Sequence, residues 1–120
     1  MKKFYLILSI TILAVINCAN AASPASQRTE QFTNDKVHVW KTVVYPHAKQ
    51  KLPMHRHDHD RVVVALSDGK LKIINDKGEV HYLTLQKGKA YFLSKDKPNE
   101  LHSDENLGDK PVIVMVIELT

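Results

Sequence analysis

The chain has 120 residues, a formal net charge of +4 and a single cysteine. This length supports one domain with one hydrophobic core, and one cysteine excludes an intrachain disulfide. The 17 Lys and Arg residues are offset by 13 Asp and Glu and form no basic run. The charge therefore does not indicate a nucleic-acid partner.

The N-terminus predicts export. Lys2 and Lys3 precede an apolar run over residues 4–16, and residues 19–21 (Ala-Asn-Ala) supply a small-x-small cleavage pattern. The apolar run is shorter than the about 20 residues that a transmembrane helix needs. We therefore expect a signal peptide over residues 1–21, a periplasmic or secreted protein, and no membrane attachment beyond export.

Cys18 allows a second interpretation, a lipid anchor on the processed chain. A lipoprotein signal usually has a small residue before the cysteine, and Asn17 stands there instead. The mismatch argues against the anchor. Cleavage after residue 21 would leave a domain over residues 22–120 that contains no cysteine.

Beyond the signal, a polar segment precedes a series of β-type segments. Residues 22–36 are polar with little periodicity and predict a flexible lead-in. Apolar segments then recur about every ten residues between Gly, Asp and Asn turns, which predicts an all-β barrel or sandwich over residues 37–120. No segment there has a sustained helical period. The predicted strands are residues 37–45, 62–66, 71–74, 80–85, 90–93 and 112–119.

The most informative segment is residues 53–61, Pro-Met-His-Arg-His-Asp-His-Asp-Arg. Its histidines at 55, 57 and 59 alternate, and alternate side chains of an extended chain point to one side. Imidazoles gathered on one side suit a borderline transition metal. A fourth histidine, His102, lies far away in the sequence.

His55 and His57 form a His-x-His pair, and an Asp-Gly turn follows at residues 68–69. This arrangement resembles the first motif of the cupin family, small jelly-roll β-barrels in which the pair is followed by a Glu and then a Gly. The Glu is missing here, because Arg61 and Val62 occupy its place. An arginine there would oppose a divalent cation, since guanidinium stays charged.

A second cupin motif runs from a Gly through a Pro-containing bend to His-x-x-x-Asn. Gly88, Pro98 and residues 102–106 (His-Ser-Asp-Glu-Asn) resemble it in order. The separation of 14 residues between Gly88 and His102 exceeds the family's usual spacing, so we expect an insertion in the bend. The resemblance covers residues 37–119 and implies a single cupin-type jelly-roll barrel, or double-stranded β-helix.

Two arrangements of the site remain open. If Arg61 points away from the barrel, His55, His57 and His102 form a three-histidine metal site that does not distinguish Zn, Fe, Mn and Ni. If Arg61 points inward, we expect no metal, and the guanidinium binds a small anion instead.

Two neighbouring side chains add alternatives. His59 becomes an additional metal ligand if the strand continues through it, or a solvated loop residue if the chain turns there. Asp60 could hydrogen-bond a ligand imidazole and fix its tautomer.

Three functions follow from these features. The first is a metal-dependent enzyme acting on a small molecule, for which the resemblance implies an oxygenase, isomerase or decarboxylase. The second is a non-enzymatic protein that binds a small anion through Arg61. The third is a structural role as a homodimer formed through sheet edges, to which the apolar segment 112–119 could contribute.

Overall fold

The computed structural model describes residues 26–47 and 51–120, which form nine strands. Within these ranges no helix is long and apolar enough to cross a bilayer. The predicted signal peptide and Cys18 lie outside the described residues. The strands are β1 (Gln27–Thr33), β2 (Val37–Val44), β3 (Leu52–His55), β4 (Arg61–Ala65), β5 (Gly69–Asn75), β6 (Val80–Leu85), β7 (Ala90–Leu93), β8 (His102–Asn106) and β9 (Val112–Leu119).

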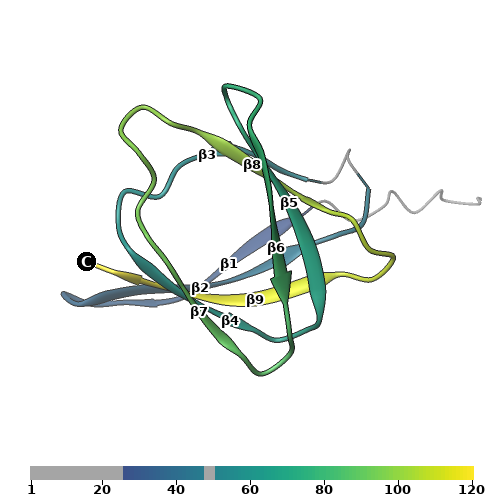
Figure 1. The fold of residues 1–120 in the computed structure, drawn as a ribbon. Helices are drawn as coiled ribbons and strands as arrows, with labels where there is room; N and C mark the ends of the chain where they lie inside the picture. The colour runs from purple at the N-terminus through teal and green to yellow at the C-terminus, as the bar shows by residue number, and fades with distance from the viewer. Residues whose placement is uncertain (1–25, 48–50) are drawn as a thin grey trace, which may run out of the picture.

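The strands form two facing antiparallel sheets (Figure 1). One has the order β1-β2-β9-β4-β7, and the other has the order β3-β8-β5-β6. From β2 onward the chain changes sheet at every connection except β5–β6, which is jelly-roll topology. The predicted all-β jelly-roll barrel is confirmed.

All six predicted strands exist. Those at 80–85, 90–93 and 112–119 have the predicted bounds, and the other three differ by one or two residues at one or both ends. β3 and β8 were not predicted as strands, because neither carries a hydrophobic alternation. These two strands are neighbours in the four-stranded sheet and hold site residues.

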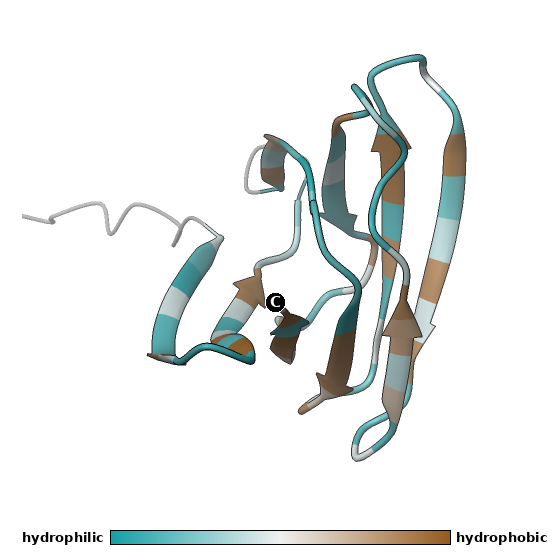
Figure 2. Cartoon of the chain, turned by 90° about the vertical axis from the view of Figure 1, so that its left-hand side faces the viewer, coloured by the Kyte–Doolittle hydropathy of each residue, from teal (hydrophilic) through white to brown (hydrophobic). Residues whose placement is uncertain are grey.

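The prediction of a flexible lead-in over residues 22–36 is wrong for residues 27–33, which form β1. Its seven side chains are all exposed, so no buried face could reveal it in the sequence. Figure 2 shows this edge strand as largely hydrophilic, next to the grey trace. The strand exists because its backbone pairs with β2, from Gln27 opposite Val43 to Thr33 opposite His38.

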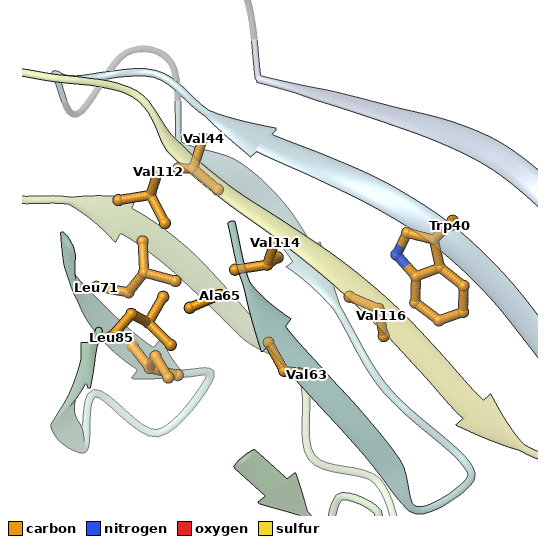
Figure 3. Close-up of a cluster of buried hydrophobic side chains, with 10 residues drawn as sticks. Trp40, Val44, Val63, Ala65, Leu71, Leu85, Val112, Val114 and Val116 are labelled. Carbon is orange, nitrogen blue, oxygen red and sulfur yellow. The ribbon is translucent and has the colours of Figure 1, made fainter. Parts of the chain in front are cut away.

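The core lies between the two sheets and follows the two-residue period of the strands. Val112, Val114 and Val116 are buried in a row along β9, facing side chains of both sheets (Figure 3). Trp40 lies beside Val116, away from Leu71 and Leu85, at the end of the core nearest the histidines. The buried cluster comprises Trp40, Val44, Val63, Ala65, Leu71, Ile73, Leu85, Val112, Val114 and Val116.

Gly69 is required by close packing of the first motif's turn against β9. A Cβ atom placed on it would lie 2.3 Å from Cγ2 of Val112, which is 1% exposed. Ordinary carbon contacts are about 3.5–4.0 Å. The Gly predicted from the motif thus lets two strands of opposite sheets approach.

Candidate metal centre

His55, His57 and His102 converge at one end of the barrel. His55 ends β3 and lies directly opposite His102 of β8 in the strand register. The chain leaves the strand after His55, and His57 follows in the loop. One nitrogen atom from each ring lies within 4.8 Å of the other two.

The surroundings of two rings orient their nitrogen atoms. Nδ1 of His55 lies 2.7 Å from the carbonyl oxygen of Pro53, and Nδ1 of His102 lies 3.1 Å from Oδ2 of Asp96. Carbonyl and carboxylate oxygens accept hydrogen bonds but do not donate them, so both contacts favour the proton on Nδ1. Each Nε2 then keeps a lone pair for a metal ion.

His57 is fixed through its backbone. Its N–H donates to Oδ2 of Asp96 at 2.7 Å, and its carbonyl accepts from the N–H of Asp96 at 2.9 Å. Its ring stacks on that of Trp40 with centroids 6.2 Å apart. Burial lowers the pKa of His57 to about 3, helped by the nearby charge of Arg61. The imidazole is therefore neutral near pH 7 and can donate a lone pair.

Asp96 and Asp104 are site residues that sequence reasoning missed. Asp104 lies on the same face of β8 as His102, two residues along, and its Oδ2 is 3.4 Å from Nε2 of His55 and 3.9 Å from Nε2 of His102. Burial raises the pKa of Asp104 and lowers that of His102. The two-residue spacing from His102 could have indicated Asp104, whereas nothing in the loop sequence singles out Asp96.

Arg61 points into the barrel together with the three imidazoles. It shares its face of β4 with the core residues Val63 and Ala65 and is 8% exposed. Its Nη1 donates to the carbonyl oxygen of Ser94 at 3.1 Å. Burial lowers its pKa, and carboxylates led by Asp96 oppose that shift. Arg61 therefore points inward while the three imidazoles still converge, a combination that the sequence analysis treated as exclusive, and nearby carboxylates offset part of the guanidinium charge.

Neither His59 nor Asp60 belongs to the group of three converging imidazoles. His59 is exposed in a bend beyond the end of β3, outside the group of three imidazoles. Oδ1 of Asp60 accepts a hydrogen bond from the backbone N–H of Lys95 at 2.9 Å. The carboxylates that contact the imidazoles are those of Asp96 and Asp104.

A cavity of about 520 Å³ extends from the imidazoles into the barrel. Polar groups, including Arg61 and Asp104, line it together with apolar side chains from both sheets. A volume of this size suits a small molecule. The apolar part of the lining includes Val44, Leu52, Val63, Leu71, Ile73, Leu83, Leu85, Leu93, Val114 and Val116.

Comparison with known proteins places the fold. No family model and no curated protein matches the chain. A cupin domain from Bordetella pertussis superposes with a TM-score of 0.68 at 24% identity, covering 82% of this chain and 97% of that one. A protein with a double-stranded β-helix domain from Klebsiella pneumoniae superposes with a TM-score of 0.60 at 19% identity, covering 82% of this chain and 79% of that one. An RmlC-like cupin from Methanocaldococcus jannaschii superposes with a TM-score of 0.59 at 11% identity, covering 82% of this chain and 84% of that one. With the sheet topology described above, these likenesses identify the chain as a cupin in fold, a double-stranded β-helix.

Proposed function

We propose that this protein binds one divalent transition-metal ion through His55, His57 and His102. The observation that carries the proposal is the orientation of the rings: Nδ1 of His55 faces a carbonyl, Nδ1 of His102 faces a carboxylate, and both arrangements leave the lone pair of Nε2 for a metal ion. His57 supplies a third, neutral imidazole within 4.8 Å. Three imidazoles are an established donor set for zinc and suit iron, manganese or nickel as well.

We also propose that a small molecule occupies the cavity beside this site. A metal ion held by the three imidazoles would orient such a molecule or act on it as a Lewis acid. The chain's own residues define the shape and polarity of the cavity. The pattern over residues 1–21, which lie outside the described part, supports a periplasmic or secreted location for this activity.

Elemental analysis of protein purified without an affinity tag tests the metal proposal. We expect close to one equivalent of a transition metal in the wild type and loss of that metal in His57→Ala. His59→Ala is the matched control, since it removes an exposed imidazole from the same segment. Circular dichroism of each variant checks folding. A wild type that neither contains nor takes up metal would refute the proposal.

A second candidate function, binding of a small anion by Arg61, rests on free hydrogen-bond donors. A guanidinium has five N–H groups. In the described part of the chain, the carbonyl oxygen of Ser94 is the one acceptor that hydrogen-bonds the Arg61 guanidinium. No side-chain nitrogen in that part is fully buried without a partner, so the other guanidinium nitrogens are not fully buried. The remaining donors of Arg61 therefore face the cavity, where a carboxylate could accept from them.

Thermal unfolding with benzoate, after removal of metal with EDTA, tests this candidate. A ligand that binds only the native state raises the apparent stability. We expect benzoate to raise the melting temperature of the wild type and of Lys70→Gln, an exposed control, but not that of Arg61→Gln. An equal rise in Arg61→Gln would rule out Arg61 as the anion site.

A further inference from the structure

We infer that Asp104 is a fourth ligand of the metal ion, so that the site combines three imidazole nitrogens with one carboxylate oxygen. This inference rests on the proposed three-histidine site and deepens it. Neither the His-x-His motif nor the predicted ligand set contains this residue.

The distances from Asp104 to two of the imidazoles are close to those of direct coordination. Nitrogen and oxygen ligands lie about 2.0–2.2 Å from a zinc ion, so neighbouring ligand atoms around one ion are roughly 3.0–3.5 Å apart. Oδ2 of Asp104 lies 3.4 Å from Nε2 of His55 and 3.9 Å from Nε2 of His102. The carboxylate oxygen therefore lies beside two of the three imidazole nitrogens, at and slightly beyond the separation of ligands that share one ion.

The backbone holds this carboxylate in place. Asp104 and His102 lie on one face of β8, and β8 pairs with a strand on each side. Asp104 lies opposite Leu52 of β3 and Ile73 of β5. A side chain in the middle of three paired strands is better fixed than one on a loop, which favours a preformed ligand.

The surroundings of Asp104 compensate its charge only in part. The residue is 8% exposed, and the charge of Arg61 offsets part of the cost of burying its carboxylate. Across residues 26–47 and 51–120, the ring nitrogens within 4 Å of its carboxylate are those of His55 and His102, and no N–H or O–H donates a hydrogen bond to it. A buried carboxylate is costly unless it is paired or coordinates a metal. A divalent cation between its oxygen and the two Nε2 atoms would supply that pairing.

Asp96 provides the contrast. Its carboxylate contacts Nδ1 of His102, on the side of the ring away from the proposed ion, and accepts the backbone N–H of His57. Asp96 is thus a positioning residue. The chain therefore offers two carboxylates against the same imidazole, one expected to coordinate and one expected only to orient.

Titration with Co²⁺, followed by its visible absorption, separates these roles. We expect Asp104→Asn to weaken Co²⁺ binding by about 100-fold or more and to change the ligand-field bands, because one ligand atom is replaced. Asp96→Asn should weaken binding by about 10–100-fold, the usual effect of an orienting group, and leave the bands unchanged. Glu105→Gln, in the same strand, should behave like the wild type.

Asp104→Cys adds a readout that does not depend on loss of binding. A cysteine thiolate that coordinates Co²⁺ gives a near-ultraviolet charge-transfer band, which the wild type should lack. Bound Co²⁺ without this band would overturn the inference, as would wild-type affinity and bands in Asp104→Asn. A wild type that binds no Co²⁺ would refute the three-histidine proposal and this inference together. If Asp104→Asn does not fold, the Asp104→Cys spectrum decides.

Discussion

The depressed pKa of His57 predicts that the metal-free protein loses stability as the pH falls. Burial, together with the charge of Arg61, lowers this pKa from 6.5 to about 3 in the folded protein. Between those two values the unfolded chain binds a proton that the folded chain does not. Stability linked to His57 is therefore complete above pH 6.5 and declines as the pH falls towards about 3.

The magnitude follows from the linkage relation. A fully shielded group changes stability by about 1.4 kcal/mol per pH unit in this window. His57 is only partly buried, so we halve this slope for solvent screening and expect ~0.7 kcal/mol per unit. From pH 6 to pH 4 the contribution is then about 1–1.5 kcal/mol.

Urea unfolding, followed by far-ultraviolet circular dichroism, measures this contribution. The free energy of unfolding of the wild type is compared with that of His57→Gln at each pH from 4 to 7, in the presence of EDTA. The comparison is needed because His102 acts in the same direction, whereas Asp104, whose pKa is raised, acts in the opposite one. Both groups remain in the variant. Wild-type and variant stabilities that run parallel with pH would refute the account of His57.

Three further predictions follow from particular contacts. Cu²⁺ should quench the fluorescence of Trp40, the sole tryptophan, because its ring stacks on His57; titration should show less quenching in His57→Ala. Gly69→Ala should cost about 1–3 kcal/mol in urea unfolding, since the new methyl overlaps Val112, and the added substitution Val112→Ala should recover part of that loss. Asn106→Ala should cost about 1–3 kcal/mol in the same assay, because it removes three hydrogen bonds to backbone groups, and stability equal to wild type would contradict this role.

The fold was predictable where a strand buries one face. β9 and β4 alternate between buried and half-buried positions, and such alternation appears directly in the sequence. β1 has no buried face, and β8 carries buried polar residues in place of apolar ones. Their pairing with neighbouring strands creates them, and a single sequence does not reveal that pairing.

The site was predictable only in part. The spacing of His55 and His57 and the second motif indicated the imidazoles, and the structure brings these together. The inward direction of Arg61 depends on the strand beginning at residue 61, since alternation then places it with Val63, whereas the predicted strand began at residue 62. Asp96 reaches His57 across 39 residues of sequence, a contact that only the tertiary structure creates.

The charges around Arg61 connect the two proposed functions. The charges of Asp96 and Asp104 act on the Arg61 guanidinium and favour its charged form. With both carboxylates ionised, Arg61, Asp96 and Asp104 sum to one negative charge, and Asp60 and Glu118 add further negative charge near the guanidinium. A divalent ion raises the local sum by two. We therefore expect Zn²⁺ and benzoate to bind cooperatively, since the ion would reduce the negative charge that the anion meets beside the free donors of Arg61.

Isothermal titration measures this coupling. Zn²⁺ should tighten benzoate binding about 5–100-fold, and benzoate should tighten Zn²⁺ binding by the same factor, because equilibrium coupling is reciprocal. Arg61→Gln should keep its Zn²⁺ affinity within a few-fold and lose most of the coupling, while Lys70→Gln should retain it. Benzoate affinity that does not change with Zn²⁺ would mean that the anion does not share the electrostatic field of the ion. The guanidinium would then act only as a partner of Asp96 and Asp104 within the barrel wall.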